Sequence, residues 1–229
     1  WCVMEKDNPL YRNQGIHVLT VLFTVEEGRF KVLLLKRDNQ PFKNMWMLVG
    51  GACYNNETVE DAMKREMYEK TGLKNVQTTF FKVYSEPNRS PVMRMIAIVY
   101  IGVIDCKKVK VLKKTLKTKD ADWFIIDRIP PLAYDHNKIL GEAIDFLKEK
   151  IFDSQILKNL FPPTFTLPEI VNAYQSILDS VIDRRNFRKK LLSEKIIEPT
   201  GEYEATTGKK PAKLYRFCDQ KSQDNRNKC

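Results

Sequence analysis

The spacing of apolar residues predicts strands over most of the first 130 positions. Two largely apolar runs, 16–25 and 31–36, flank a Glu-Glu-Gly turn and therefore predict a β-hairpin. β-branched and aromatic residues fill 78–84, 95–104 and 122–126, which we also predict to be strands.

A helix follows these strands. Apolar residues recur at 139, 140, 143, 144 and 147, which places them on one stripe of a helix that begins after Asp135. We expect this stripe to pack on the sheet, as in an α/β domain. His136 lies in the first turn, and we interpret it as a surface or packing residue rather than a base.

A second helix, which precedes the first one in the sequence, is predicted over 59–71. Thr58 is a suitable N-cap, with Asp61 three residues later as in a capping box. Gly72 stands where a helix ends in a left-handed residue.

This second helix carries carboxylates on one face. Glu66, Glu69 and position 70 stand at i, i+3 and i+4, so their side chains converge. Carboxylates packed in this way repel one another, and a hard divalent cation with a diphosphate is the usual remedy. The stretch 51–73 resembles the Nudix box, which implies the catalytic candidates Glu57, Arg65, Glu66 and Glu69 and a magnesium site at Glu66 and Glu69.

Lysine at position 70 departs from the box, which usually has a second glutamate there. A cation cannot ligate a cation, so a Mg²⁺ site remains possible but is weakened. Lys70 also gains a helix ion pair with Glu66, worth roughly 0.3–0.5 kcal/mol. We therefore favour weak or absent hydrolysis. The alternative is an active enzyme that holds Mg²⁺ through Glu57, Glu66, Glu69 and substrate phosphates.

Other candidates for ligand binding surround the box. Arg37 follows the predicted hairpin, and Gly50 and Gly51 end a Trp-Met-Leu-Val-Gly-Gly approach to the helix. Arg89 and Arg94 lie in a loop punctuated by prolines. These two arginines are either solvated loop charges or contacts to phosphate, for which the planar guanidinium is well suited.

The composition changes at 154–163, where two adjacent prolines indicate a domain boundary. Beyond it, Thr166 and Glu169 form a capping box for a helix over 167–178. Asp183 caps a further helix over 184–193, in which Phe187 and Leu191 are the apolar pair. Two short strands, 195–199 and 213–217, are expected to flank a glycine-bounded tip at 201–208.

Two helices followed by a hairpin with a basic tip are typical of a winged helix-turn-helix, whose second helix enters the major groove. A charged helix alone is usually only a solvated face, but the basic wing in the right order favours DNA binding. Like-charge pairs at i, i+4 on this helix also cost energy that an anionic partner would remove. The predicted DNA-binding residues are Arg184, Arg185, Asn186, Arg188, Lys189, Lys190, Lys209 and Lys210.

Composition limits the remaining possibilities. The net charge of +10 and pI near 9.3 favour an anionic partner without naming one. The five cysteines have no paired spacing, so neither a zinc site nor a disulfide framework is indicated, and we expect a cytoplasmic protein. No apolar run approaches the roughly 18 residues that span a bilayer, so no membrane partner is expected.

Besides the box, four stretches closely resemble the Nudix-related transcriptional regulator family, in which a Nudix-like sensor domain precedes a winged helix. They are 132–136, 165–167, 183–191 and 210–217, and with the box they cover nearly the whole chain. The resemblance implies a Nudix α/β/α sandwich with a mixed sheet, followed by a small winged helix domain. It also implies a bacterial repressor or activator that is a homodimer through its Nudix domains.

From the resemblance and the composition change we expect a sensor domain at 1–153, a DNA-binding domain at 154–218 and a disordered tail at 219–229. The expected partners are double-stranded operator DNA and an effector, which is ADP-ribose, a related phosphosugar or a free pentose. Two alternatives stay open: a hydrolase of ADP-ribose-like diphosphates with an accessory C-terminal domain, and a scaffold that does not bind nucleic acid.

Overall fold

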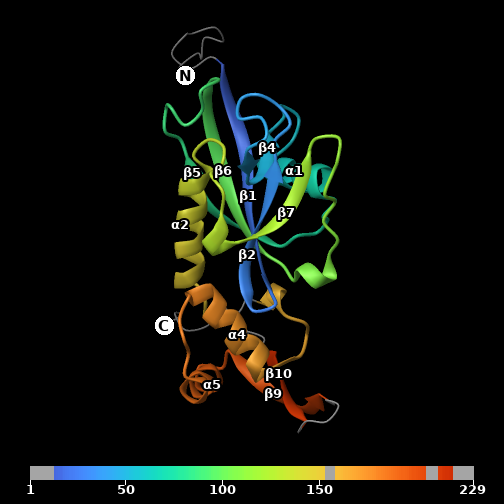
Figure 1. The fold of residues 1–229 in the computed structure, drawn as a ribbon, viewed down its shortest axis with the longest axis vertical. Helices are drawn as coiled ribbons and strands as arrows, with labels where there is room; N and C mark the ends of the chain where they lie inside the picture. Colours follow the sequence, from blue (N-terminus) through green and yellow to red (C-terminus); the bar gives the residue numbers. More distant parts are fainter. Residues whose placement is uncertain (1–12, 153–157, 205–210, 219–229) are drawn as a thin grey trace, which may run out of the picture.

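The computed structural model describes residues 13–152, 158–204 and 211–218. They form two parts stacked along the long axis of the molecule, a larger sheet-containing part and a smaller part made by the C-terminal residues (Figure 1). The predicted boundary between 153 and 154 falls at residues outside the described ranges, as does the tail after 218.

The larger part is a mixed sheet of seven strands in which β3, β2, β1, β6 and β5 are neighbours in that order. β4 also pairs with β1, and β7 with β2. The β1–β6 pair is parallel and the other pairs are antiparallel. The strands are β1 (Gln14–Glu26), β2 (Arg29–Lys36), β3 (Trp46–Met47), β4 (Val49–Ala52), β5 (Thr78–Tyr84), β6 (Arg94–Val103) and β7 (Asp120–Ile125).

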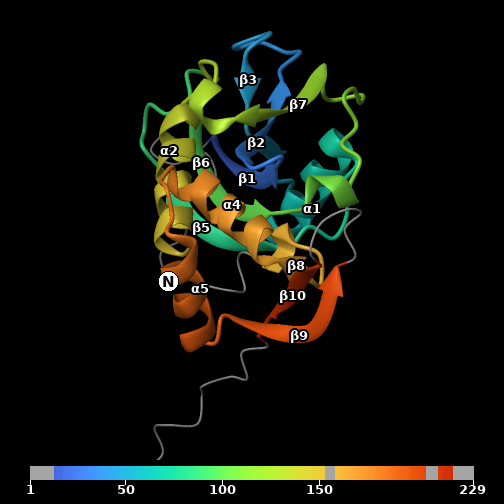
Figure 2. The same cartoon turned by 60° about the horizontal axis from the view of Figure 1, so that its bottom comes forward.

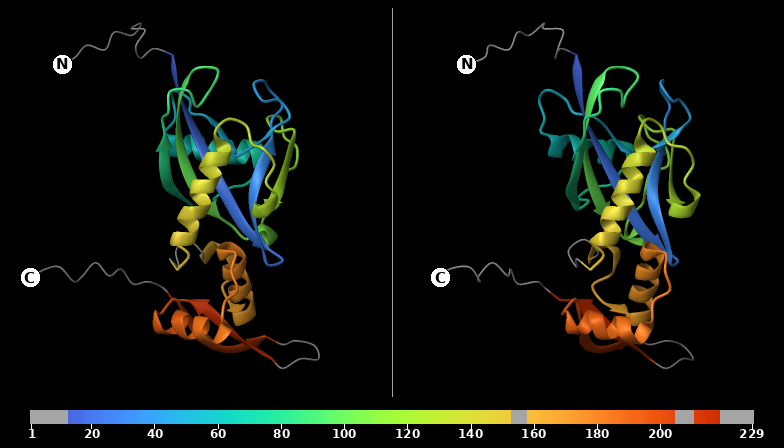
Figure 3. Two further views of the ribbon diagram at one scale, coloured as in Figure 1. Left: turned by 60° about the vertical axis from the view of Figure 1, so that its left-hand side comes forward. Right: turned by 90° about the vertical axis from the view of Figure 1, so that its left-hand side faces the viewer.

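Helices cover both faces of the sheet, because alternate residues of β1 point to opposite sides. Val21 and Phe23 share one buried cluster with apolar residues of α2 (His136–Glu149). Leu22 shares the other cluster with Met67 of α1 (Val59–Thr71). α2 and α1 accordingly lie on opposite sides of the strands (Figure 3), so the predicted α/β/α sandwich with a mixed sheet is confirmed. Short 3₁₀ turns, η1 (Cys106–Lys108) and η2 (Ile126–Arg128), join the later elements.

α1 has the predicted bounds because both ends are capped as the sequence indicates. The hydroxyl of Thr58 accepts a hydrogen bond from the backbone N–H of Asp61 at 3.1 Å. At the other end, Gly72 is left-handed, with φ of 76°, and its N–H donates to the carbonyl of Tyr68.

The smaller part is a winged helix. Its three strands lie in the order β8, β10, β9, beside two helices (Figure 2). The two helices have the predicted bounds, and α4 carries the predicted capping box at Thr166 and Glu169. The elements are η3 (Lys158–Leu160), β8 (Phe165–Thr166), α4 (Leu167–Leu178), α5 (Arg184–Ser193), β9 (Ile197–Glu204) and β10 (Ala212–Phe217).

Two details of the winged helix differ from the sequence prediction. β9 continues through Gly201 to Glu204, whereas we had expected a tip to begin at Gly201. The chain can stay extended because β9 and β10 are still paired at Glu204 and Ala212. β8 was not predicted. Its two residues pair with β10, whereas the sequence indicated only that Thr166 caps the following helix.

The two parts meet where α4 lies against the end of the β1–β2 hairpin (Figures 1 and 3). Phe30 of β2 and Ile177 of α4 belong to the same buried cluster. A polar contact joins the parts as well, since Lys108 Nζ donates to the carbonyl of Phe161 at 3.0 Å. The apolar core is therefore continuous between the two parts.

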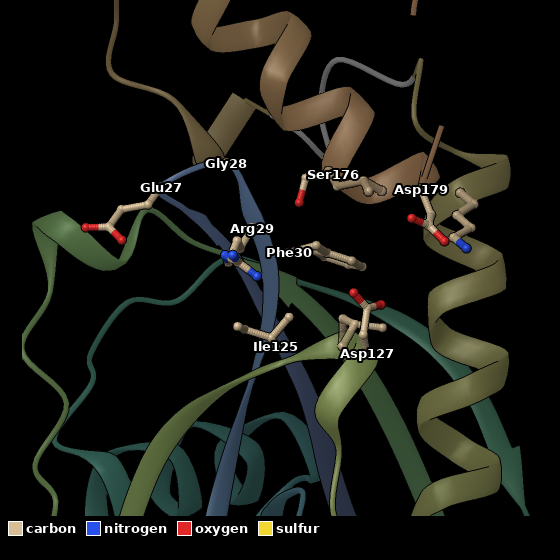
Figure 4. Close-up of a pocket in the computed structure, with 11 residues that line it drawn as sticks. Glu27, Gly28, Arg29, Phe30, Ile125, Asp127, Ser176 and Asp179 are labelled. Carbon is tan, nitrogen blue, oxygen red and sulfur yellow. The ribbon is translucent and has the colours of Figure 1, made fainter. Parts of the chain in front are cut away.

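An open cavity of about 420 Å³ lies at this junction (Figure 4). The β1–β2 turn, the end of β7, α2 and the end of α4 contribute to its wall. Arg29 and Lys148 face it together with Glu27, Asp127 and Asp179, so charges of both signs surround it. No helix within the described ranges is long and apolar enough to cross a membrane.

Candidate functional site

One guanidinium, that of Arg65, holds together the carboxylates of the box. Arg65 pairs with both oxygens of Glu57, at 2.6 and 2.8 Å. Its Nη1 also donates to Glu66 Oε1 at 2.6 Å and to Glu69 Oε2 at 3.2 Å. Its Nη2 reaches the carbonyl of Ala52 at 2.8 Å, which ties the helix to β4. The structure thus brings all four predicted catalytic residues together.

These contacts and one further lysine favour the ionised forms of Glu57 and Glu69. Hydrogen bonding to Arg65 lowers the pKa of Glu57 to about 2. The pKa of Glu69 is lowered as well, chiefly by Lys117, whose Nζ donates to Glu69 Oε2 at 2.6 Å. Lys117 was not predicted as a site residue, because it belongs to a lysine-rich segment that reads as solvated surface.

Lys70 lies inside the protein rather than on the exposed helix face. Its Nζ is 3.0 Å from Glu66 Oε2, so the predicted ion pair is present, and it also donates to the carbonyl of Gly50. Only 9% of Lys70 and 4% of Glu66 are exposed. The energy expected for an exposed helix pair therefore does not apply, because both charges have lost most of their water.

Glycine at position 51 makes room for the same arrangement. A Cβ atom on Gly51 would overlap the carboxyl group of Glu66. The glycine turn therefore allows the carboxylate of α1 to lie directly against the backbone of β4.

A cationic pocket of about 70 Å³ adjoins Lys70. Arg37 and Arg89 contribute the other cations. Arg37 is fixed by a hydrogen bond from Nε to the carbonyl of Pro41 at 2.9 Å and lies over the ring of Tyr134. Arg89 pairs through two nitrogens with Asp135, at 2.7 and 3.0 Å. The residues lining the pocket are His17, Leu19, Arg37, Met47, Gly50, Gly51, Lys70, Arg89, Ser90, Met95, Tyr134 and His136.

The pairing with Arg89 corrects one expectation about α2. Asp135 occupies the N-cap position, but its side chain makes no capping hydrogen bond. The carboxylate instead orients the guanidinium of Arg89 at the pocket, since the bidentate ion pair competes for the same oxygens.

A half-buried histidine, His17, and a buried one, His136, complete the pocket. Burial, reinforced by the nearby cations Arg89, Lys70 and Arg37, lowers the pKa of His17 to about 4 and that of His136 to about 3. His136 Nδ1 accepts a hydrogen bond from the N–H of Leu48 at 3.1 Å, so its proton is on Nε2. Both rings are therefore neutral at physiological pH.

The predicted ligand residues divide into two groups. Arg37, Gly50, Gly51 and Arg89 line the pocket. Arg94 does not; its Nη1 donates to the carbonyl of Ser85 at 2.6 Å and so ties the two ends of the loop together. His136, interpreted from the sequence as a surface or packing residue, also lines the pocket; His17 and Tyr134 were missed because nothing in their spacing connects them to the box.

The predicted DNA-binding side chains form an exposed face of α5. Asp183 caps this helix, and Phe187 and Leu191 bury its other face, as predicted. Arg188 Nε donates to the hydroxyl of Tyr215 at 3.1 Å, which links the helix to β10. Lys190 Nζ lies 3.7 Å from the centre of the Phe152 ring. The six exposed residues are Arg184, Arg185, Asn186, Arg188, Lys189 and Lys190.

Lys209 and Lys210, also predicted to bind DNA, lie outside the described residues. Among the described residues, Arg184, Arg185 and Lys189 have no acidic partner. The positive charge of this face is therefore not neutralised within the described part of the chain.

The family described as "NUDIX domain" matches residues 14–144, more than half of the chain. The chain belongs to the Nudix family. The family described as "NrtR DNA-binding winged helix domain" matches residues 157–217, so this Nudix protein carries a C-terminal winged helix domain of the NrtR type.

The known proteins that are similar to this Nudix protein include the following three. The ADPR responsive transcriptional repressor NtrR of Acinetobacter baylyi is 28% identical over 200 residues, 86% of this chain and 79% of that protein. The ADP-ribose pyrophosphatase of Methanocaldococcus jannaschii is 37% identical over 141 residues, 61% of this chain and 80% of that protein. The structure of Shewanella oneidensis NrtR complexed with a 27mer DNA has a TM-score of 0.75 and 24% identity and covers 89% of this chain and 93% of that chain. The last similarity concerns the fold, which extends through both domains.

Proposed function

We propose that this protein is a transcriptional repressor whose winged helix binds operator DNA and whose Nudix pocket binds ADP-ribose. The similarity to the Acinetobacter baylyi repressor, which extends over 86% of the chain, supports both parts of the proposal. The observation that carries it is the charge arrangement of the box, where Glu57, Glu66 and Glu69 are each already paired with a cation of the protein.

This pairing favours binding over hydrolysis. Nudix domains use a divalent metal such as Mg²⁺. The box of this chain does not fit one well: Arg65 occupies oxygens of all three glutamates, and Lys70 faces the remaining oxygen of Glu66. Across the described ranges, no group of three His, Cys, Asp or Glu side chains could hold a metal ion. We infer that hydrolysis is weak or absent.

The pocket suits an anionic ligand. Lys70, Arg37 and Arg89 surround it, and its volume of about 70 Å³ accommodates one phosphate-sized group. We infer that a phosphate of ADP-ribose enters this cavity while the rest of the ligand lies outside it.

The exposed face of α5 supports DNA binding. Arginine and asparagine pair with guanine and adenine edges, and lysines neutralise phosphates. We assign base reading to Arg184, Arg185 and Asn186. We assign Lys189 and Lys190 to the backbone, with Lys209 and Lys210 on the wing. Arg188, held by Tyr215, completes the face.

Release of the operator requires that ADP-ribose bind one arrangement of the protein better than another, because equal affinity for both shifts nothing. We propose a cytoplasmic homodimer, so the operator is expected to be palindromic, with half-sites about one helical turn or a multiple apart.

The direct test is fluorescence anisotropy with labelled DNA from the region upstream of the gene. We expect binding that weakens steeply as salt rises, because phosphate contacts release counterions. Micromolar ADP-ribose should dissociate the complex, whereas AMP should not. Binding of equal strength to a scrambled duplex would contradict the proposal.

The second candidate is a hydrolase of ADP-ribose-like diphosphates. The 37% identity to the Methanocaldococcus jannaschii pyrophosphatase and the presence of Glu57, Arg65, Glu66 and Glu69 favour it. Turnover of ADP-ribose with Mg²⁺ at about 1 per second or faster, lost on Glu66→Gln, would establish this activity.

A further inference from the structure

The ammonium group of Lys70 connects two elements through oxygen atoms. It contacts Glu66 Oε2 on α1 and the carbonyl oxygen of Gly50 on β4. Carboxylate and backbone carbonyl oxygens are also the ligands that hard divalent cations prefer. A single charged group therefore neutralises the box carboxylate and joins the helix to the strand.

We propose that the Lys70 ammonium takes the place of the divalent cation, so that the pocket binds a phosphate-bearing effector without metal. The proposal deepens the proposed function, since it specifies how ADP-ribose is recognised. The lysine side chain is tethered to the protein, so the cation at this position does not depend on metal supply.

Burial fixes the ammonium in place. Lys70 is 9% exposed, and its one charged partner within the described part of the chain is Glu66, which is itself buried. Removing the Glu66 carboxylate would leave the Lys70 ammonium group buried and unpaired, which is strongly destabilising, whereas Glu66 would keep its pair with Arg65 if Lys70 were removed. Burial lowers the pKa of Lys70, and the adjacent Glu66 carboxylate opposes that change.

Lys70 also has a donor available for a ligand. An ammonium group has three N–H donors. One of them is donated to the carbonyl of Gly50, Glu66 Oε2 lies at ion-pair distance, and Lys70 lines the cationic pocket beside Arg37 and Arg89. Phosphate oxygens in the pocket can therefore be bound by three protein cations directly.

The replacement also has a chemical consequence. A metal ion lowers the pKa of its bound water and so generates a nucleophile at neutral pH, and an ammonium group cannot. Lys70 thus keeps the charge that binds a diphosphate and omits the Lewis acid that would help to cleave it.

The first experiment uses Mn²⁺ as a probe of the metal position, and it does not depend on any effector. The full-length native protein should bind no Mn²⁺ below about 1 mM in electron paramagnetic resonance titrations, whereas Lys70→Glu should gain one site. Submillimolar Mn²⁺ binding by the native protein, or a folded Lys70→Glu protein without a new site, overturns the proposal.

The second experiment measures ADP-ribose binding by calorimetry with EDTA and with Mg²⁺. We expect the native affinity to agree within about twofold between the two conditions. Lys70→Met should lose about tenfold or more in both, because it keeps the stem and removes the charge. Lys64→Met is the matched control, an exposed lysine of the same helix, and should bind as the native protein does.

The outcomes separate the two proposals. Native binding that requires Mg²⁺ overturns the metal-free site and leaves the repressor intact. Absence of ADP-ribose binding in both buffers overturns the proposed effector, and the Mn²⁺ result then decides alone whether Lys70 occupies the metal position. Thermal unfolding of each variant identifies any that fails to fold, in which case the native Mn²⁺ titration still decides.

Discussion

At the scale of single residues, the pocket combines two arginines that stay charged with two histidines that stay neutral. Arg37 and Arg89 are each fixed by a carbonyl or a carboxylate. His17 and His136 stay neutral because their burial and the surrounding cations disfavour a further positive charge. The pocket therefore offers both ionic contacts and neutral hydrogen-bonding groups to a ligand.

The lowered pKa of His136 predicts acid destabilisation. The folded-state pKa, about 3, lies below the unfolded value of 6.5, so the unfolded chain binds more protons between these values. The stabilisation is fully present above pH 6.5 and is lost as the pH falls toward 3. From pH 7 to pH 5 we expect this residue to account for a loss of about 2 kcal/mol in the free energy of unfolding.

Between pH 7 and pH 5, the free energy of unfolding of His136→Gln should fall by about 2 kcal/mol less than that of the native protein. Urea unfolding at the two pH values measures this difference. Lys64→Gln, which changes an exposed residue, should keep the native pH dependence. Parallel pH profiles for the native protein and His136→Gln would contradict the assignment.

At the scale of elements, α5 is the helix to which we assign DNA recognition. Its cap at Asp183 and its buried pair, Phe187 and Leu191, fix which face stays exposed. The hydrogen bond from Arg188 to Tyr215 sets this face relative to β10. The orientation of the cationic side chains thus follows from apolar contacts on the opposite side of the helix.

Arg185→Ala should weaken operator binding by about 1–3 kcal/mol and relax the sequence preference at one position, provided that its guanidinium pairs with a base. Anisotropy titrations with the operator and with a single-base variant measure both effects. Lys64→Ala removes a positive charge from the sensor domain and should leave operator affinity nearly unchanged. A loss that is equal on all duplexes would instead assign Arg185 to a phosphate.

The sequence predicted the bounds of three helices but missed a short strand and the burial of one side chain. The bounds of α1, α4 and α5 were predicted from Thr58, Thr166 and Asp183, because capping is a local property of the chain. β8 was missed because two residues carry no periodicity. The ion pair of Lys70 was predicted from its spacing, but its burial was not, because burial depends on β4, which lies about 20 residues away in the sequence. The pocket histidines come from distant segments and could not be connected without the fold.

At the scale of the whole molecule, the two domains share one apolar core. Phe30 and Val32 of β2 lie in the same buried cluster as Tyr174 and Ile177 of α4. Shared apolar contacts couple the unfolding of the parts that make them. We therefore expect the domains to unfold together, and a change at the sensor to reach the winged helix through this contact.

Ile177→Ala tests this coupling. It should lower the free energy of unfolding by about 2–5 kcal/mol, because it leaves a cavity at a fully buried site. In calorimetry we expect a single transition for the native protein to separate into two. Leu140→Ala, within the sensor domain, should lower stability without separating the transitions. ADP-ribose should also release the operator less effectively from Ile177→Ala than from the native protein.

β1 is long enough to connect the ligand pocket with the contact between the two domains. The strand carries His17 at the pocket, and its hairpin turn at Glu27 meets the winged helix. Ten residues of extended chain span about 33 Å. A tilt of about 3° at the ligand end would therefore carry the far end sideways by about 1.7 Å over such a span. A stiff strand of this kind acts as a lever arm, so we expect a small displacement at the pocket to shift the winged helix by more than an ångström.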